Sequence, residues 1–231
     1  PRGKAGVFLF GQLSGAILSM GIEVLWQSPA ERLIRSADGS SIAGVETSAG
    51  QRVRAREGVI LACGGFLHDE EMKRDFLNSC PVHFYGNPGN TGDGVRMAQE
   101  VGAGLWHMNQ MVGRAVGNFQ LADGTSLTLL LALDPPGYVI TDRYGRRFAD
   151  ESVQARLLNG FYHHLLQYDP VRAVQPRNPC YWFFDENRRR SGRLTLAGIG
   201  ADAVGLFSWS EDNRREIERG WIDSGATVAE A

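Results

Sequence analysis

The stretch GVILACGGF, residues 58–66, joins a short apolar run to a pair of glycines. Residues 58–62 have the continuous apolar character of a strand that is buried on both faces of a parallel sheet. In open α/β sheets, ligands bind beyond the carboxyl ends of the strands, where glycines let the backbone approach a phosphate or a ribose. The stretch indicates an α/β fold and is compatible with a ligand beside Gly64 and Gly65, but taken alone a plain strand-to-loop turn is the more common cause of the same pattern.

A second glycine-rich stretch, NTGDG at residues 90–94, precedes a predicted helix at residues 95–101. The N-terminus of a helix attracts anions, and an aspartate there can accept hydrogen bonds from the hydroxyl groups of a ribose or a ribityl chain. Asp93 can equally serve as a plain helix cap, a role that aspartate often fills. Taken alone, this stretch leaves a ligand site and a capped helix as alternatives.

The rest of the pattern predicts two domains, residues 1–104 and 105–231. In the first, we expect a helix over residues 7–20, a hairpin turn at Asp38-Gly39 and a helix capped by Asp69. In the second, a helix is predicted over residues 151–168, and the arginines at 188–190 are interpreted as a solvated run. Strands are predicted at residues 22–26, 33–34, 42–47, 51–55, 127–133, 138–141 and 181–185.

The composition excludes several classes of protein. Of 231 residues, 43% are hydrophobic and 22% are charged, which excludes a disordered polar segment. A net charge of -2 offers no basic excess for nucleic acid or an anionic membrane. No apolar run approaches the length of a membrane span, and no metal site is predicted. The three cysteines, which include no C-x-x-C pair, are interpreted as free thiols in a reducing, cytoplasmic compartment.

The order of the segments resembles the FAD-dependent superfamily of fumarate reductases, succinate dehydrogenases and 3-ketosteroid dehydrogenases. Residues 59–66 are similar to the family segment V-I-L-A-T-G-G-F, with Cys63 in place of the threonine. Residues 90–98 are close to N-T-G-D-G-I-x-M-A, and residues 142–151 are similar to N-x-x-G-x-R-F-x-N-E. Residues 21–34 are similar to the strand that lies along the adenosine half of FAD.

This resemblance implies an α/β fold: a partial, Rossmann-like FAD-binding domain with an attached α+β capping domain. The implied cofactor is FAD, and the implied partner is a small-molecule substrate that lies between cap and flavin. The implied reaction moves hydride between the flavin and a carbon–carbon bond beside a carbonyl group. The residues expected to contact FAD are Ala30, Ala62, Gly64, Gly65, Thr91, Gly92 and Asp93.

The candidate catalytic residues are Arg147, Glu151 and Arg156, near the entry to the capping domain. Two proton donors known in the family do not carry over: Gln154 stands where fumarate reductases have the arginine of E-x-x-R, and Ala155 where ketosteroid dehydrogenases have a tyrosine. The missing arginine and the aromatic residues of the cap favour a ketosteroid-like ketone, although aromatic residues at such positions more often form the core of the cap. The alternatives are a reductase of fumarate or another unsaturated acid, and a non-catalytic fragment.

The family's G-x-G-x-x-G turn, which seats the FAD pyrophosphate, does not precede these segments, so the chain resembles an internal fragment of a longer flavoprotein. Each hydrogen bond to the charged pyrophosphate is worth roughly 1.5–3 kcal/mol. Losing three of them removes about 4.5–9 kcal/mol, so residues 1–231 alone are expected to bind FAD no more tightly than about micromolar. Calorimetric titration with FAD measures this; a nanomolar constant would mean that the chain builds a pyrophosphate site of its own.

Overall fold

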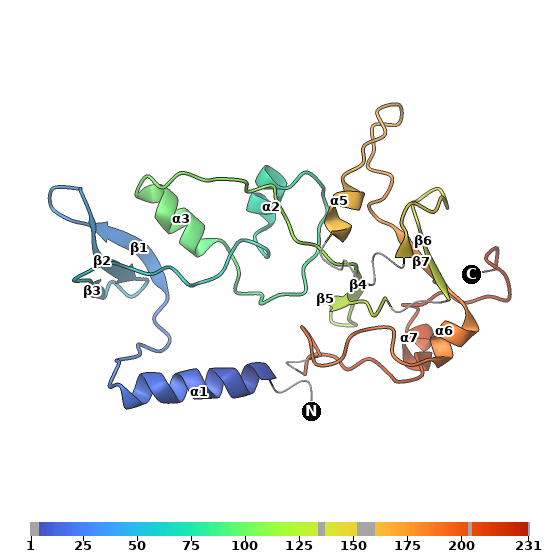
Figure 1. Cartoon of the computed structure of the whole chain (residues 1–231), viewed down its shortest axis with the longest axis horizontal. Helices are drawn as coiled ribbons and strands as arrows, with labels where there is room; N and C mark the ends of the chain where they lie inside the picture. Colours follow the sequence, from blue (N-terminus) through green and yellow to red (C-terminus); the bar gives the residue numbers. More distant parts are fainter. Residues whose placement is uncertain (1–4, 134–136, 152–159, 203–204, 231) are drawn as a thin grey trace. The chain divides into compact units, whose positions relative to one another are not determined.

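The computed structural model describes residues 5–133, 137–151, 160–202 and 205–230. The chain divides into two compact units, one of Pro1–Phe76 with Gly86–Met108 and one of Leu77–Tyr85 with Asn109–Ala231. Both units combine short helices with antiparallel strands, which gives a mixed helix-and-strand fold (Figure 1).

The first unit begins with helix α1 (Ala5–Ser19) and continues into a three-stranded antiparallel sheet. The sheet has the order β1 (Ala30–Arg35), β2 (Ile42–Thr47), β3 (Arg52–Arg54). In the β1–β2 turn, the Asp38 carboxylate accepts a 3.1 Å hydrogen bond from the Ser40 amide, and Gly39 has a φ of +71°. The predicted first helix and hairpin are thus confirmed.

Two short helices complete this unit, α2 (Glu70–Phe76) and α3 (Asp93–Glu100). The Asp69 carboxylate accepts a 2.8 Å hydrogen bond from the Met72 amide, which confirms the predicted cap of α2. The buried side chains of Phe66, Met72 and Met97 give the two helices an apolar base.

Two predicted strands of the first unit are not formed. Residues 22–26 and 58–62 have no strand structure, and Ile60, expected to be buried on both sides, is 92% exposed. A strand in a parallel sheet is stable only when neighbouring strands pair with its backbone groups. No described residue pairs with residues 58–62. The prediction of a buried parallel strand is wrong here because an apolar run signals burial but does not supply the partner strand.

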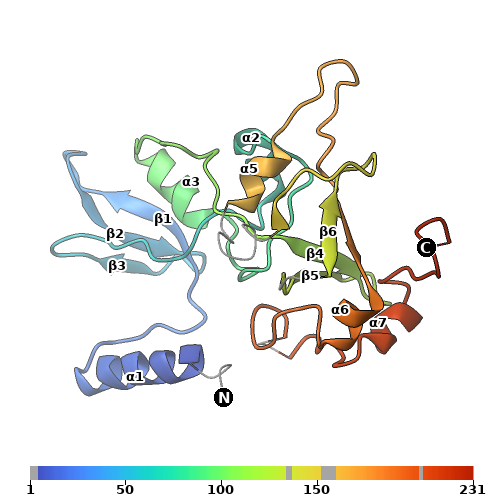
Figure 2. The same ribbon diagram turned by 45° about the vertical axis from the view of Figure 1, so that its right-hand side comes forward.

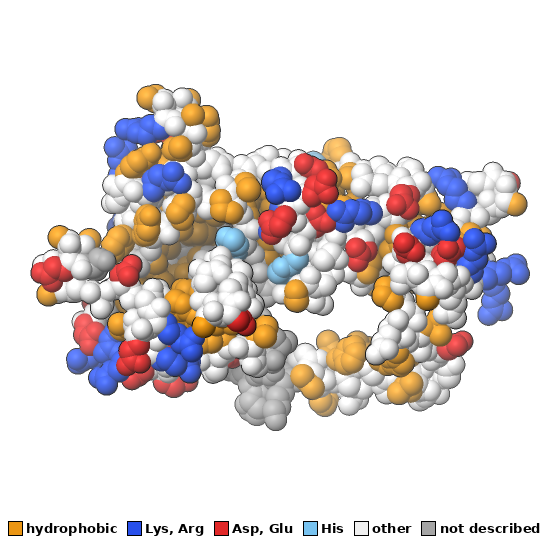
Figure 3. All heavy atoms as spheres, turned by 180° about the vertical axis from the view of Figure 1, so that it is seen from behind, with side chains coloured by type: hydrophobic (Ala, Val, Ile, Leu, Met, Phe, Trp, Pro, Cys, Tyr) orange, Lys and Arg blue, Asp and Glu red, His pale blue; other side chains and the backbone are white. Residues whose placement is uncertain are grey.

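Helix α1 is apolar around its circumference and nevertheless exposed. Val7 and Phe10 are 75% and 67% exposed, and Figure 3 shows hydrophobic side chains spread along this helix at its lower right. A helix that is apolar on all sides is normally buried. The first unit therefore exposes apolar side chains along α1 and, at another place in the chain, at Ile60 and Leu61. Among the described residues, no helix has both the length and the hydrophobicity that crossing a membrane requires.

The second unit is built on two antiparallel strand pairs (Figure 2). β4 (Val116–Gln120) pairs with β5 (Ser126–Leu130), and β6 (Tyr138–Thr141) pairs with β7 (Tyr181–Phe184). The predictions of strands at β5, β6 and β7 are confirmed. β4 is not predicted, because it contains Gly117 and polar residues, which have low strand propensity. The helices are α5 (Phe161–Leu165), α6 (Glu186–Arg190) and α7 (Arg214–Glu218). Of the helix predicted over residues 151–168, residues 152–159 lie outside the described residues.

Two apolar clusters form the core of this unit. The first contains Trp209, and the ring of Phe119 stacks on Trp221 with centroids 4.9 Å apart. The second lies around Ile140 and Phe161. Aromatic residues in the sequence after residue 205 are therefore core residues of the second unit.

Arg188 contradicts the interpretation of residues 188–190 as a solvated run. Its side chain is buried, and its guanidinium donates hydrogen bonds to the Ala132 carbonyl at 2.6 Å and to Oγ of Ser191 at 2.8 Å. The same group lies 5.8 Å from the centre of the Trp182 ring. These contacts replace part of the hydration that the charge loses on burial, while Nε of Arg188 has no hydrogen-bond partner among the described residues.

Asn213 holds the C-terminal part of the second unit together. It is fully buried, and its Oδ1 accepts hydrogen bonds from the Leu194 amide at 3.1 Å and from Nε1 of Trp209 at 2.7 Å. Its Nδ2 donates to the carbonyls of Arg189 at 2.7 Å and Gly192 at 2.9 Å. Its φ of +61° is a backbone conformation that asparagine tolerates better than most residues.

We predict that Asn213→Ala lowers the free energy of unfolding by about 2–4 kcal/mol, because it leaves buried donors and acceptors without partners. Chemical denaturation followed by tryptophan fluorescence measures the change. Asn187→Ala, at an exposed position of α6, is the matched control and should change stability by less than about 0.5 kcal/mol. Equal effects of the two substitutions would contradict the central role of Asn213.

Candidate functional site

The two glycine-rich stretches lie side by side in the first unit. The Gly92 amide donates a 3.0 Å hydrogen bond to the Gly65 carbonyl, and the His68 amide donates one of 3.0 Å to the Asn90 carbonyl. A Cβ atom built on Gly94 would lie 2.7 Å from Sγ of Cys63. Two segments that are separated in the sequence thus lie in direct contact.

Gly64 and Gly65 are glycines for different reasons. Gly64 has a φ of +86°, and a Cβ atom there would lie 2.0 Å from Oδ1 of Asn90, so the loop itself requires glycine. Gly65 lies outside the left-handed region, and a Cβ atom there would meet no described atom within 4 Å. Gly65 therefore presents bare backbone to open space, as expected where a ligand approaches the main chain.

Gly92, not Asp93, is the N-cap of α3. Gly92 has a φ of +82°, and a Cβ atom there would lie 2.5 Å from Sδ of Met72, so this position also requires glycine. No side chain among the described residues caps the helix. The alternative in which Asp93 is a plain helix cap is therefore wrong. Its carboxylate is exposed and accepts a 3.1 Å hydrogen bond from the Thr91 hydroxyl.

The exposed Asp93 carboxylate selects the kind of group that can bind here. The free amides at the start of α3 attract negative charge, but the charge of Asp93 repels a phosphate placed beside it. A hydroxyl group, by contrast, can donate a hydrogen bond to the carboxylate. The bare backbone at Gly65 and the carboxylate of Asp93 therefore fit the ribityl or ribose hydroxyls of FAD.

The other predicted cofactor contacts are only partly brought together. Thr91 lies in the same loop as Asp93, and Ala62 is exposed in the segment that leads to Cys63. Ala30 lies at the start of β1, opposite Thr47 of β2. No contact within the described part of the chain joins Ala30 to Gly65 or Asp93.

Glu151 and Arg147, two candidate catalytic residues, form an ion pair in the second unit. Glu151 is 5% exposed, and its carboxylate accepts hydrogen bonds from the Ile140 amide at 2.9 Å and from Nε of Arg147 at 3.0 Å. Burial raises the pKa of Glu151, but the hydrogen bonds from Arg147 and Ile140 outweigh it, so the net pKa is lowered. The ionised carboxylate anchors the chain at residue 151. Arg156 lies outside the described residues.

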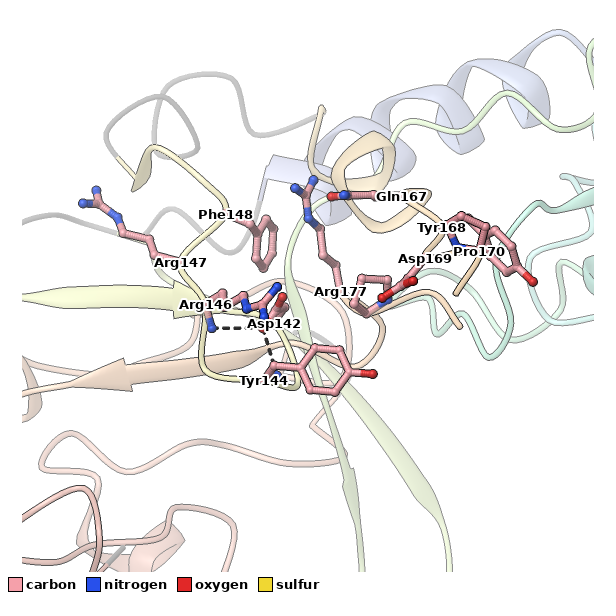
Figure 4. Close-up of a pocket in the computed structure, with 11 residues that line it drawn as sticks. Asp142, Tyr144, Arg146, Arg147, Phe148, Gln167, Tyr168, Asp169, Pro170 and Arg177 are labelled. Carbon is pink, nitrogen blue, oxygen red and sulfur yellow. Dashed lines mark hydrogen bonds between the residues drawn. The ribbon is translucent and has the colours of Figure 1, made fainter. Parts of the chain in front are cut away.

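A hollow of about 400 Å³ in the second unit is lined by arginine and aromatic side chains (Figure 4). The Arg177 guanidinium lies 4.8 Å from the centre of the Phe148 ring and donates to the His164 carbonyl at 3.2 Å. Asp142 fixes the turn on the other wall by accepting hydrogen bonds from two backbone amides, as the dashed lines in Figure 4 show. Of the predicted site residues, Arg147 belongs to this lining.

Two residues that the sequence does not single out for function support the glycine-rich loop. Arg96 donates a 2.8 Å hydrogen bond to the Thr91 carbonyl and forms an ion pair with Asp69. The predicted cap of α2 identifies Asp69 as structurally important, but nothing in the sequence indicates that Asp69 and Arg96 meet.

Comparison with known proteins gives one family and several relatives. Residues 5–191 match the family model described as FAD binding domain. The chain is 30% identical over 204 residues to 4-oxocyclohexanecarboxylate 2-dehydrogenase of Sinomonas cyclohexanicum. This match covers 80% of the chain and 34% of that protein. It is 30% identical over 199 residues to 3-oxosteroid 1-dehydrogenase of Mycobacterium tuberculosis, covering 79% of the chain and 30% of that protein.

A solved structure shares the fold. The crystal structure of 3-ketosteroid delta1-dehydrogenase from Sterolibacterium denitrificans, in complex with 1,4-androstadiene-3,17-dione, matches with a TM-score of 0.64 at 23% identity. The match covers 79% of the chain and 33% of that structure. The chain thus spans about one third of the length of the relatives it matches.

We predict that Gly65→Val weakens FAD binding by the whole protein and leaves the thermal unfolding of the apoprotein nearly unchanged, because the added side chain occupies only ligand space. Gly64→Val is the matched variant: its φ of +86° and the nearby Asn90 should make it destabilise the apoprotein. FAD titration and thermal unfolding measure the two effects. If Gly65→Val destabilises the apoprotein as much as Gly64→Val does, Gly65 is a structural glycine.

We also predict that the ion pair of Glu151 makes the stability of the second unit depend on pH. Because the pKa of folded Glu151 lies below its unfolded value of about 4.3, its contribution is complete above that pH and is lost as the pH falls through the folded pKa. Glu151→Gln lacks this contribution at every pH. The difference in unfolding temperature between wild type and variant should therefore shrink from about pH 6 to about pH 3. Calorimetry measures it; a constant difference would contradict the assignment.

Proposed function

The chain belongs to the FAD binding domain family, and from this membership we propose that the whole protein is an FAD-dependent oxidoreductase acting on a carbon–carbon bond beside a carbonyl group. FAD, when bound, supplies hydride transfer to or from the substrate. The residues of this chain bind and orient the cofactor and hold the substrate side of the site in place.

One observation of the structure carries this proposal. The hydrogen bond between the Gly92 amide and the Gly65 carbonyl brings the bare backbone at Gly65 next to the residue that precedes the exposed Asp93. These groups can hold the sugar-like hydroxyls of FAD, with Asp93 as hydrogen-bond acceptor and Gly65 leaving room for the ligand. A charge-assisted hydrogen bond of this kind is worth roughly 1.5–3 kcal/mol.

We propose that residues outside this chain complete the cofactor site. The chain spans about one third of the length of its relatives, and the exposed apolar side chains of α1 are of the kind that normally pack against other structure. This agrees with the weak FAD binding expected of residues 1–231 alone.

For the catalytic side, we propose that Arg147 and Glu151 position the chain and that Arg156 is the candidate for proton transfer. The Glu151 carboxylate is occupied by Arg147 and the Ile140 amide, which suits an anchor better than a proton donor. That anchor fixes the main chain five residues before Arg156.

We also propose a cytoplasmic location, which the free cysteines Cys63, Cys80 and Cys180 support.

For the substrate, we propose a ring ketone of the ketosteroid-like class. Support comes from two relatives whose names specify an oxosteroid and an oxocyclohexane carboxylate, both ring ketones. The aromatic residues of the second unit lend less support than expected, because Phe161 and Tyr162 are buried in the unit itself.

An activity assay of the whole protein tests this proposal. We expect the purified protein to show the absorption bands of bound flavin and to turn over a 3-oxosteroid or a cyclohexanone with an artificial electron acceptor. Fumarate with a reduced viologen dye is the comparison, and no turnover is expected there. Turnover of fumarate alone would establish the unsaturated-acid alternative, and a protein that takes up no FAD would contradict the proposal altogether.

A further inference from the structure

We propose that Arg96 is the positioning residue of the cofactor loop and that it acts by fixing the orientation of one peptide group, Thr91–Gly92. The proposal rests on the proposed role of Asp93 and Gly65 in holding FAD. Arg96 lies in the second turn of α3, and its guanidinium folds back over the residues that precede the helix.

Both polar ends of the Thr91–Gly92 peptide are held, each from a different side. The carbonyl of Thr91 accepts a 2.8 Å hydrogen bond from Nη1 of Arg96, and the amide of Gly92 donates a 3.0 Å hydrogen bond to the Gly65 carbonyl. A peptide group is planar, so fixing its carbonyl and its amide together fixes its rotation about the chain axis. Thr91 and Asp93 lie directly before and after Gly92. The orientation of the peptide group therefore affects where their polar side chains, which belong to the candidate site, are placed.

The guanidinium of Arg96 is itself fixed by a second contact. Its Nη2 forms an ion pair with Oδ2 of Asp69, and the Asp69 side chain is 12% exposed. The other carboxylate oxygen of Asp69 accepts the Met72 amide at 2.8 Å, so Asp69 cannot swing away without uncapping α2. The start of α2 is thereby connected through Arg96 to the loop at residues 91–93.

The conformation held by Arg96 is one that the loop would not keep by sequence preference alone. Gly92 lies in the left-handed region with a φ of +82°. Because a glycine adopts positive and negative φ values with similar energy, Gly92 by itself would leave the loop free to change conformation. A fixed guanidinium removes this freedom before the cofactor binds, so less ordering free energy is lost on binding. Arg96 therefore favours a pre-organised Asp93 without contacting the cofactor itself.

Amide hydrogen exchange of the whole apoprotein tests the positioning step without FAD. Arg96→Met keeps a long side chain and removes the contacts with Thr91 and Asp69, together with a longer ion pair of 3.9 Å to Glu71. We expect the Gly92 amide to exchange about 10-fold faster or more. Loss of the charged hydrogen bond from Arg96 to the Thr91 carbonyl makes the loop open more often, and the Gly92 amide exchanges when the loop is open. Amides of the β1–β2 hairpin, such as Val45, are the internal control and should keep their rates. Unchanged exchange at Gly92 would overturn the proposal.

FAD titration of the whole apoprotein tests the consequence for binding. Arg96→Met should raise the dissociation constant about 10-fold at an unchanged midpoint of thermal unfolding, and Arg96→Lys, which keeps the charge, should recover part of the affinity. Asp69→Asn, which keeps an oxygen for the Met72 amide but loses the ion pair, should show a smaller effect in the same direction. Combined with Arg96→Met it should add little, since both act through one contact.

Asp93→Ala separates failure of this proposal from failure of the proposed function. If Asp93→Ala weakens FAD binding by about 10- to 150-fold while Arg96→Met does not change it, the site stands and the role of Arg96 is overturned. If neither variant changes FAD affinity although Gly92 exchanges faster in Arg96→Met, the loop is not the cofactor site, and the positioning role fails with it. A loss of affinity matched by an equal loss of stability would make Arg96 a structural residue.

Discussion

The hydrogen bond from the Gly92 amide to the Gly65 carbonyl is the contact on which the candidate site depends. It joins two loops that each carry part of the chemistry, bare backbone at Gly65 and an exposed carboxylate at Asp93. Three glycines make the contact possible. Gly64 and Gly92 adopt left-handed conformations against neighbouring side chains, and Gly65 leaves the space in front of the loop open. The same few residues therefore serve the fold and the proposed binding of FAD.

Buried polar groups play the corresponding role in the second unit. Helices α6 and α7 have five residues each, far too few to be stable by helix formation alone. Asn213 and Arg188 hold them through hydrogen bonds to backbone carbonyls and amides of distant segments. The Glu151 carboxylate holds the main chain at residue 151 in the same way, by accepting a hydrogen bond from the Ile140 amide. A side chain that looks catalytic or solvated in the sequence can thus be committed to holding the main chain.

This distinction bears on the proposed chemistry. A carboxylate that accepts hydrogen bonds from two residues and has a lowered pKa is a poor proton donor, which supports the proposal that Glu151 positions the chain. Asp93 is the opposite case, because its carboxylate is exposed and leaves the capping of α3 to Gly92. Both acidic residues lie in motifs that resemble the family, but one carboxylate is buried and paired and the other is exposed.

The sequence by itself determined the elements that depend on neighbouring residues. The first helix, the hairpin at Asp38-Gly39 and the capping of α2 by Asp69 all follow from local spacing and turn chemistry, and the ordered motifs indicated the FAD-binding family. Tertiary structure alone decided what depends on distant partners: that residues 58–62 form no strand, that Arg188 is buried, and that Arg96 meets Asp69 and Thr91. The reason is physical, since pairing, burial and ion pairing require a second group whose position the local sequence does not specify.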